Sequence, residues 1–340
     1  MREKNNLSNV NFASKIKEKR QGVFSFMIKD KKIIPIVFAT DDIYVPILSV
    51  ALRSILDNAS KDNCYKIYIL NTELSAESFE KINEFNCDIM EIKYVNVAER
   101  MDKINKDKIH LRDYYTKAIY YRIFIPDLFP QHDKILYLDC DIVLLEDVAN
   151  LYNQDVGDNV FIAVHEETMT VMNIFGEYSE KFLGVERKNY FNSGLLLINT
   201  KKYIEEKIEE KFIELMHAHK FEVAPDQDYL NFLCKNKIKY AEIGWNKTPF
   251  PKEVNPFDEN EIKLVHYKLN FKPWHYYGVR YEKYFWQYAR KTPYYEFLLK
   301  MRDEFTAEQA KVDERGFIQL QQTAKNYIES EINYKNFKVE

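Results

Sequence analysis

The sequence predicts an α/β protein in which a mixed, Rossmann-like sheet is flanked by helices and followed by a helical extension at the carboxyl end. Three observations support this fold class. Apolar runs of strand length alternate with amphipathic runs of helix length over the first third of the chain. The 340 residues are 46% hydrophobic, which is ample for one large core. From Tyr281 onward no strand pattern remains, so helices are expected there.

The first elements form strand–helix units. Residues 33–39 are an apolar run that predicts a buried strand, and the following helix has Pro46 in its first turn. A strand at 65–70, a helix that opens near Ser75 and a strand at 89–95 continue the alternation. This order favours parallel pairing and a doubly wound topology.

The middle of the chain brings acidic residues to the end of a strand. A helix is expected from about Thr116 to just before Pro126, because proline interrupts helices. The apolar run 134–138 then predicts a strand that delivers Asp139 and Asp141 at its carboxyl end. Open α/β sheets bind ligands at that end.

The second half continues with shorter elements. The pattern predicts strands at 160–164 and 195–199, a helix capped by Thr200 that runs to Met216, a helix at 226–234 and a strand ending at Ile243. The loop 245–257 is rich in proline, asparagine and aromatic residues, and we expect that it could close over a ligand.

Composition and charge argue against several classes of function. A net charge of −4 provides no basic excess for a nucleic-acid partner. The four cysteines lie far apart without a C-x-x-C pair, which favours reduced thiols and a cytoplasmic location. Residues 1–20 contain no apolar stretch suited to a signal sequence or a membrane span. With 8 glycines against 25 tyrosines, nucleotide binding is not expected to use a glycine-rich phosphate loop.

Asp139 and Asp141 can turn two carboxylates toward one point, which suits a hard divalent cation. In an alternative without a metal site, one carboxylate caps the next element and the other is solvated. An active alternative is a phosphatase of the haloacid-dehalogenase type, whose nucleophile also lies in a D-x-D after an apolar strand. That motif belongs to the first strand of its domain, whereas here several strand–helix units precede it, so this alternative ranks a distant second.

Several short sequence blocks follow one another along the chain. They are Phe38-Ala39-Thr40-Asp41-Asp42 with Tyr44, Tyr121-Arg122, Leu136-Tyr137-Leu138-Asp139-Cys140-Asp141, Tyr190-Phe191-Asn192-Ser193-Gly194, Asp226-Gln227-Asp228, and His266 with Lys272-Pro273-Trp274. In this order the blocks resemble family 8 of the glycosyltransferases, which includes glycogenin and bacterial lipooligosaccharide galactosyltransferases, and the likeness extends from about Ile36 to His275. The resemblance implies a GT-A fold, a UDP-sugar donor, manganese and transfer with retention of anomeric configuration.

The resemblance also implies a metal site and a nucleotide site. Asp139, Asp141 and His266 match the metal ligands, and such mixed oxygen and nitrogen ligation favours Mn²⁺ or Mg²⁺ over structural zinc. A lone His266 would otherwise be a core or surface histidine. The residues that match the uridine-binding positions are Ala39, Asp41 and Tyr44, for which the alternative is an ordinary strand end and helix start.

Further matches concern the donor sugar and its diphosphate. Arg122 and Lys272 match positions that contact them, and without the family both would be taken as surface charges. A cation at the β-phosphate stabilises charge as the sugar–phosphate bond breaks. The UDP-sugar positions also include Cys140, Asn192, Ser193, Asp226 and Gln227. Asp226 could equally cap the helix that it opens.

Gln227 matches the residue nearest the anomeric carbon, on the face opposite the leaving group. A neutral amide is a poor nucleophile. We therefore favour a front-face route, in which the departing diphosphate helps to deprotonate the acceptor hydroxyl. Within this scheme, Gln227, Asp226, Lys272 and Arg122 are the catalytic candidates.

Two positions depart from the family pattern. Ile43 stands where the family often has asparagine, which removes one polar contact to the nucleotide. Leu269 replaces the glycine of H-x-x-G-x-x-K-P-W, so close backbone approach to the phosphate is in question there. Neither change removes an expected metal ligand.

These observations predict a retaining hexosyltransferase that moves galactose or glucose from UDP to a glycan, glycolipid or glycoprotein acceptor. The alternative is a non-catalytic protein that binds nucleotide sugars, and the intact set of site residues argues against it. The expected organisation is a polar leader at 1–32, a GT-A domain at 33–278 and a helical extension at 279–340. Richness in lysine, asparagine, isoleucine and tyrosine hints at a low-GC bacterium.

The extension mixes aromatic and basic side chains between Tyr281 and Arg302. These could lie on an anionic membrane surface, which would place the protein at the inner face of the membrane. They could also form an acceptor groove or pack on the domain. Packing is the favoured interpretation, because aromatic stripes at helical spacing are usually core.

Overall fold

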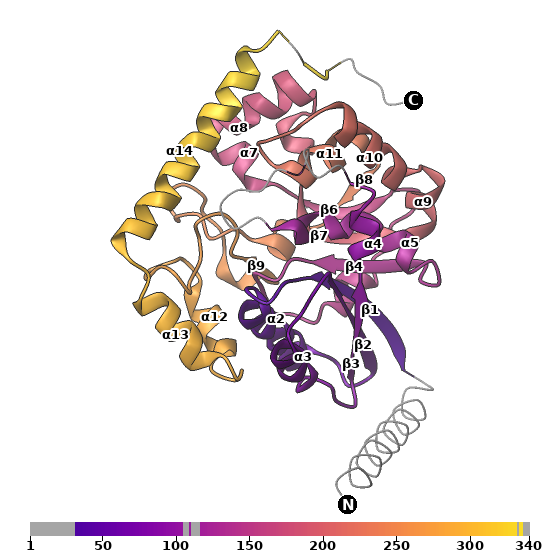
Figure 1. The fold of residues 1–340 in the computed structure, drawn as a ribbon, viewed down its shortest axis with the longest axis vertical. Helices are drawn as coiled ribbons and strands as arrows, with labels where there is room; N and C mark the ends of the chain where they lie inside the picture. Colours follow the sequence, from indigo (N-terminus) through magenta and orange to yellow (C-terminus); the bar gives the residue numbers. More distant parts are fainter. Residues whose placement is uncertain (1–30, 105–108, 110–115, 332, 336–340) are drawn as a thin grey trace, which may run out of the picture.

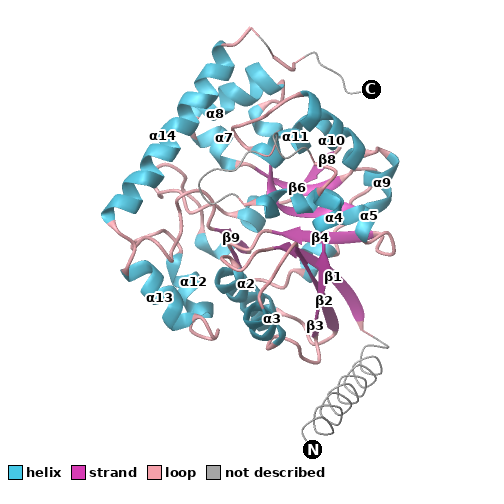
Figure 2. Cartoon of the chain, viewed as in Figure 1, coloured by secondary structure: helices cyan, strands magenta, loops and turns pink. Residues whose placement is uncertain are grey.

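The computed structural model describes residues 31–104, 109, 116–331 and 333–335. Nearly all of the leader expected at 1–32 therefore lies outside the described residues. Figures 1 and 2 show a central sheet between layers of helices, with helices α12 to α14 along one flank.

The main sheet has seven strands in the order β3-β2-β1-β4-β7-β6-β8. β7 is antiparallel to β4 and to β6, and the other neighbouring pairs are parallel. The carboxyl ends of β1, β4 and β6 therefore lie at one edge. The strands are β1 (Lys32–Ala39), β2 (Asn63–Asn71), β3 (Met90–Asn96), β4 (Lys134–Leu138), β6 (Phe161–His165), β7 (Phe191–Asn199) and β8 (Ile238–Tyr240). The predicted mixed sheet is confirmed.

The strands carry apolar side chains on both faces, as a sheet between two helical layers requires. In β1, Ile36 and Phe38 join a core formed with α2 and α3, whereas Val37 lies in a second core with η2, α8, α10 and α11. The helices before the extension are α2 (Val45–Asn58), α3 (Ala76–Asn83), α4 (Ala98–Met101), η2 (Lys117–Phe124), α5 (Ile125–Leu128), α6 (Ala149–Tyr152), α7 (Glu167–Val171), α8 (Asn173–Tyr178), η3 (Ser179–Leu183), η4 (Arg187–Asn189), α9 (Thr200–Glu205), α10 (Ile208–Ala218), α11 (Pro225–Leu233), η5 (Ile243–Asn246) and η6 (Glu259–Glu261).

A second, two-stranded sheet was not predicted. β5 (Ile142–Leu144) pairs antiparallel with β9 (Leu264–His266), and this register places Ile142 opposite His266. The backbone N–H of Tyr267 donates to the carbonyl of Asp141 over 2.8 Å. This pairing brings a distant part of the chain beside the end of β4.

Several expected boundaries were wrong. The helix expected from Thr200 to Met216 is divided into α9 and α10, because Lys207 adopts a left-handed backbone conformation with φ of 53°. Its cap is Asn199, whose side chain accepts from the N–H of Lys202, so Thr200 is already the first helical residue. The strand expected to end at Ile243 ends at Tyr240.

The chain also remains helical through Pro126. The helix expected near Thr116 is the 3-10 helix η2, with Thr116 at its N-cap. Pro126 then lies in the first turn of α5, where a missing N–H costs no hydrogen bond.

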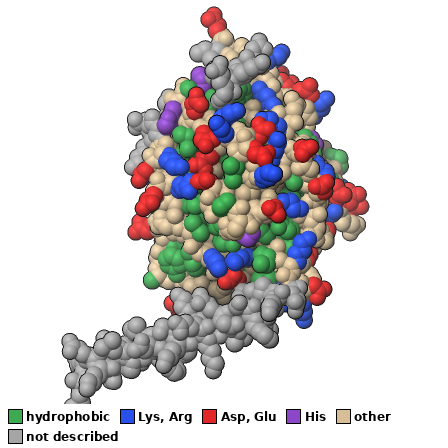
Figure 3. Space-filling view, turned by 90° about the vertical axis from the view of Figure 1, so that its right-hand side faces the viewer, with side chains coloured by type: hydrophobic (Ala, Val, Ile, Leu, Met, Phe, Trp, Pro, Cys, Tyr) green, Lys and Arg blue, Asp and Glu red, His purple; other side chains and the backbone are tan. Residues whose placement is uncertain are grey.

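The extension is helical, as predicted, and consists of α12 (Glu282–Ala289), α13 (Tyr295–Asp303) and α14 (Ala307–Glu329). Phe285, Trp286 and Tyr288 of α12 are buried, and they pack with Ile47 of α2 and other core residues. Packing on the domain, the favoured interpretation, is confirmed for these aromatic residues. Figure 3 draws the side of the molecule that faces away from α12 to α14, and on that side cationic and anionic side chains are interspersed.

Within the part of the chain that the structure describes, no helix is both long and apolar enough to cross a bilayer.

Candidate active site

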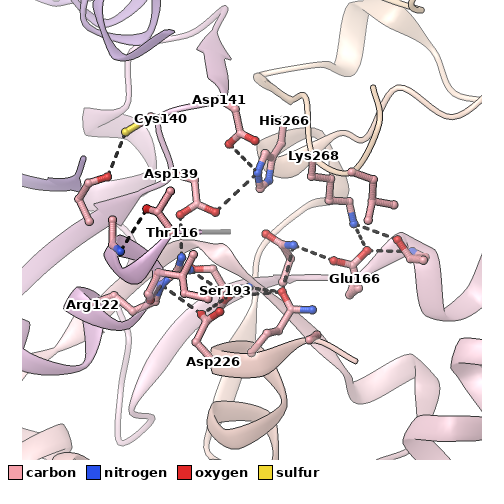
Figure 4. A pocket seen from close by; sticks show the side chains of 18 of the residues that line it. Thr116, Arg122, Asp139, Cys140, Asp141, Glu166, Ser193, Asp226, His266 and Lys268 are labelled. Carbon is pink, nitrogen blue, oxygen red and sulfur yellow. Dashed lines mark hydrogen bonds and ion pairs between the residues drawn. The ribbon is translucent and has the colours of Figure 1, made fainter. Parts of the chain in front are cut away.

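One cleft is lined by every residue predicted to bind the metal or the UDP-sugar. It opens at the carboxyl ends of β1, β4 and β6, and Figure 4 shows part of it. The predicted residues that line it are Ala39, Asp41, Tyr44, Arg122, Asp139, Cys140, Asp141, Asn192, Ser193, Asp226, Gln227, His266 and Lys272. Side chains from β1, η2, β7, α11 and β9, and from the loops near them, thus face a common space.

Asp139, Asp141 and His266 form a cluster whose ligand atoms all lie within 4.8 Å of one another. The Nε2 atom of His266 is 3.2 Å from Oδ1 of Asp141 and 3.7 Å from Oδ2 of Asp139. Two carboxylate oxygens and one imidazole nitrogen suit a divalent cation and leave positions open for other oxygens. The geometry therefore fits the metal site that the resemblance implies.

The orientation of the His266 ring supports this fit. Its Nδ1 lies 2.8 Å from Oδ1 of Asn246, and Nδ2 of Asn246 donates to Oδ1 of Asn192 over 2.8 Å. Because the amide oxygen of Asn246 is an acceptor, the proton of the neutral ring belongs on Nδ1. The lone pair of Nε2 then faces the two aspartates.

Each aspartate uses one oxygen for a cationic side chain and turns the other toward His266. Oδ1 of Asp139 accepts from Nη2 of Arg122 (2.9 Å) and from the hydroxyl of Tyr137 (2.7 Å). Oδ2 of Asp141 accepts from Nζ of Lys272 over 2.6 Å. Burial alone raises the pKa of Asp141, but the ammonium of Lys272 outweighs it and holds that pKa below its usual range. The carboxylate is therefore charged.

Arg122 and Lys272 are not surface charges. Their exposed fractions are 4% and 3%, so that alternative was wrong. The guanidinium of Arg122 donates to the carbonyl of Ser193 (2.6 Å) and lies 3.2 Å from Oδ2 of Asp226. It thereby connects the end of β4 with β7 and α11.

Asp226 does not cap α11, so the capping alternative was also wrong. The N-cap position is Ala224, which has no side-chain cap. The carboxylate of Asp226 instead accepts from Oγ of Ser193 (3.0 Å) and pairs with Arg122. Burial raises the pKa of Asp226, and Arg122 opposes that effect.

Gln227 is held by its amide oxygen. Oε1 accepts from the backbone N–H of Ser193 (2.8 Å) and from Nδ2 of Asn192 (3.1 Å). Its Nε2 lies 3.5 Å from the hydroxyl of Tyr190, which itself donates to Asp228 over 2.5 Å. The oxygen is thus occupied by two donors.

Asp41 and Tyr44 line the cleft in the segment just before α2. Oδ1 of Asp41 accepts from the N–H of Tyr44 over 3.2 Å. The thiol of Cys140 donates to the carbonyl of Ala39 over 3.2 Å and connects the end of β1 with the end of β4. The side chain of Ile43 has no polar atom, is 71% exposed and does not line the cleft.

Glu166 lines the same cleft and was missed from the sequence. It follows β6 as Asp139 follows β4. Because open α/β sheets bind ligands at the carboxyl ends of their strands, this position could have indicated it. Its carboxylate accepts from Nδ2 of Asn192 (2.7 Å) and from the N–H of Thr168 (2.9 Å), and it pairs with Lys268. Asn246 was also missed, and no local pattern indicates it.

The loop 245–257 does not close over the cleft, contrary to expectation. None of its residues lines the cleft, and Trp245 is buried in the core. The loop is held in place by Glu167, which pairs with Lys247 (2.5 Å) and accepts from the N–H of Thr248 (2.8 Å). The guanidinium of Arg280 donates to two of its carbonyls.

Leu269 keeps the backbone shape that glycine would supply. Its φ of 54° is left-handed, and it lines the cleft. For a leucine this conformation costs about 1–2 kcal/mol. The substitution therefore retains the path of the chain at the expense of strain.

We expect Leu269→Gly to be more stable than Leu269→Ala by about 1 kcal/mol, because only glycine relieves the strain of a positive φ. At positions with negative φ, the alanine variant is normally the more stable of the two. Urea unfolding of both variants measures the difference. An alanine variant as stable as the glycine variant would contradict the strain.

Gly194 lies against the metal cluster. A Cβ atom there would come within 2.4 Å of both Oδ2 of Asp139 and Cε1 of His266, and 3.0 Å from Oδ1 of Asn192. The ligands could keep their positions only if this residue has no side chain.

Gly194→Ala is accordingly expected to weaken Mn²⁺ binding about tenfold or more while the protein remains folded, because the methyl group must displace a ligand. Titration of Mn²⁺ by calorimetry, with thermal unfolding as the folding check, measures this effect. Unchanged Mn²⁺ affinity would show that the ligands are not held as described.

Comparisons with known proteins point to one family. The model of glycosyl transferase family 8 matches residues 35–278. The lipopolysaccharide glucosyltransferase WaaO of Escherichia coli K12 is 35% identical over 177 residues, which cover 47% of this chain and 50% of WaaO. GlyE of Streptococcus pneumoniae is 29% identical over 272 residues, 75% of this chain and 60% of GlyE. The chain thus spans about half to two thirds of these relatives.

Solved structures show the same fold. The galactosyltransferase LgtC, in complex with donor and acceptor sugar analogs, superposes with a TM-score of 0.61 at 25% identity, over 76% of this chain and 96% of LgtC. The bifunctional glycosyltransferase WbbM gives a TM-score of 0.70 at 22% identity, over 80% of this chain and 52% of WbbM. The fold is GT-A, and the chain belongs to glycosyltransferase family 8.

Proposed function

We propose that this protein transfers galactose or glucose from UDP to a glycan, glycolipid or glycoprotein acceptor, with retention and with Mn²⁺ or Mg²⁺. The observation that carries the proposal is the cluster of Asp139, Asp141 and His266 in the same cleft as Arg122 and Gln227. WaaO is named a glucosyltransferase and LgtC a galactosyltransferase, which supports a hexose donor.

In this proposal Asp139, Asp141 and His266 hold the cation, which when bound offsets the charge of the donor diphosphate. Arg122 and Lys272 are buried beside these carboxylates and add fixed positive charge where the sugar–phosphate bond breaks. Asp41 and Tyr44 would hold the uridine, with the Tyr44 ring stacked on uracil. Ala39 and Cys140 complete that end.

Asn192, Ser193, Asp226 and Gln227 would line the donor hexose. Because Oε1 of Gln227 already accepts two hydrogen bonds, its lone pairs are poorly placed for attack on the anomeric carbon. This supports the front-face route, in which Gln227 positions the sugar and the departing diphosphate assists deprotonation of the acceptor.

The test is UDP release from UDP-galactose and UDP-glucose with Mn²⁺, and then with EDTA. We expect turnover with at least one donor and its loss with the chelator. Intact UDP binding without turnover of either donor would favour the non-catalytic binder.

The finer organisation is part of the proposal. We place a GT-A domain at 33–278 and a helical extension at 279–340, and we place the protein in the cytoplasm because its four cysteines are free thiols. Peripheral contact with the inner face of the membrane would use the aromatic side chains of the extension that remain exposed, such as Phe297. Liposome flotation with and without residues 281–340 tests that contact, and equal flotation of both forms would end the idea.

A further inference from the structure

α14 lies outside the segment that the family model matches, yet it is fixed to the parts of the chain that build the cleft. It begins with a capping box between Thr306 and Gln309 and runs along one flank as far as α8 (Figure 1). Its Asp313 accepts from the hydroxyl of Tyr276 over 2.6 Å, and the ring of Phe317 lies 6.2 Å from that of Phe175. The helix therefore bridges the segment after His266 and α8.

One face of α14 points toward the domain. Asp313, Phe317, Leu320, Ala324 and Tyr327 recur at helical spacing along that face, and Leu320 and Ala324 are buried. The opposite face carries exposed side chains, including Ile318, which is 57% exposed. The inward face is thus distinct from the solvent face.

Phe317 and Leu320 line the cleft itself. They form an apolar wall together with side chains from α7, from α8 and from the segment before α11, namely Met169, Phe175 and Val223. The rest of the cleft, which includes Asp41, the metal cluster, Glu166 and Lys268, is largely polar and charged. One part of the cleft therefore suits a diphosphate, and another part suits an apolar group.

We propose that this wall is the acceptor subsite, and that the acceptor carries an apolar aglycone which packs on Phe317 and Leu320. The inference rests on the proposed function, which assigns the polar part of the cleft, with Asp41 and the metal cluster, to the donor. The hydroxyls of a bare sugar need hydrogen-bond partners, which these five side chains do not offer. An alkyl or acyl group needs none and gains by leaving water.

Calorimetric titration of the full chain with UDP and Mn²⁺ present tests this, with methyl β-glucoside, octyl β-glucoside and the matching galactosides as probes. Octyl glycosides are used below their critical micelle concentration. We expect at least one octyl glycoside to bind about tenfold or more tightly than its methyl counterpart, because each buried methylene contributes about fourfold. Phe317→Ala should remove most of that advantage.

Matched variants separate the possible causes. Ile318→Ala, on the solvent face of the same helix, should bind octyl glycosides as the wild type does. Phe317→Leu keeps an apolar surface and should retain most of the advantage, and thermal unfolding shows whether each variant is folded. Equal affinity for methyl and octyl glycosides, or binding of neither, overturns the inference.

Equal weakening of both glycosides by Phe317→Ala would also overturn it, because the ring would then contact the sugar. Titration of UDP with Mn²⁺ in the same samples distinguishes the two proposals. If UDP does not bind, the proposed function fails. If UDP binds and the octyl advantage is absent, only the acceptor inference fails.

Discussion

Asp141→Asn should reduce Mn²⁺-dependent UDP release at least about a thousandfold. The change removes one charged ligand from the cluster and also leaves the ammonium of Lys272, 2.6 Å away and 3% exposed, without its carboxylate. Loss of an electrostatic group at the reacting diphosphate costs about 4 kcal/mol of barrier, which corresponds to about a thousandfold in rate. The unpaired Lys272 also lowers the stability of the fold by about 3–5 kcal/mol, so thermal unfolding checks that the variant is folded. The rate is measured as UDP release at saturating donor over a range of Mn²⁺ concentrations.

The matched control is Asp158→Asn, because Asp158 is exposed on a turn outside the cleft. It should retain wild-type rates. If Asp141→Asn kept a rate within tenfold of the wild type at the same Mn²⁺ concentration, the metal site would have to be placed elsewhere.

Arg122→Lys should lower kcat about a hundredfold or more, although the charge is conserved. The guanidinium contacts Asp139, Ser193 and Asp226 at once, and a single ammonium cannot reproduce that planar set of donors. Loss of one such stabilising group at a reacting centre costs on the order of 3 kcal/mol of barrier. Steady-state kinetics of UDP release, with kcat and the donor KM separated, measures the effect.

Arg290→Lys provides the control, because Arg290 is exposed at the end of α12, away from the cleft. Normal kcat for Arg122→Lys would contradict this expectation. It would show that Arg122 supplies only charge and that its contacts joining β4, β7 and α11 are not needed for the reaction.

Much of the fold follows from the sequence because the strands are continuous apolar runs. The strand before Asp139 was predicted with its observed bounds, and the cleft opens at its carboxyl end. Local capping was harder to predict. Asn199 and Thr200 are both good caps, and the choice between them depends on where β7 ends.

The rest of the site depends on contacts between distant segments. His266 could be assigned only through family resemblance, because β5 and β9 have three residues each and show no periodicity of their own. Asn246 orients the His266 ring from a 3-10 turn, and nothing in the local sequence marks it. Glu166 did have a signal, its place after β6, but it is not part of a D-x-D pair.

The short β5–β9 sheet brings together the two distant segments that carry the residues of the metal cluster. Two ligands precede β5 and the third ends β9, so no peptide that stops before residue 264 can present the complete set. A cation bound there would cross-link segments separated by about a third of the chain. A chain in which β5 and β9 are unpaired would therefore lack a complete set of ligands for the cation.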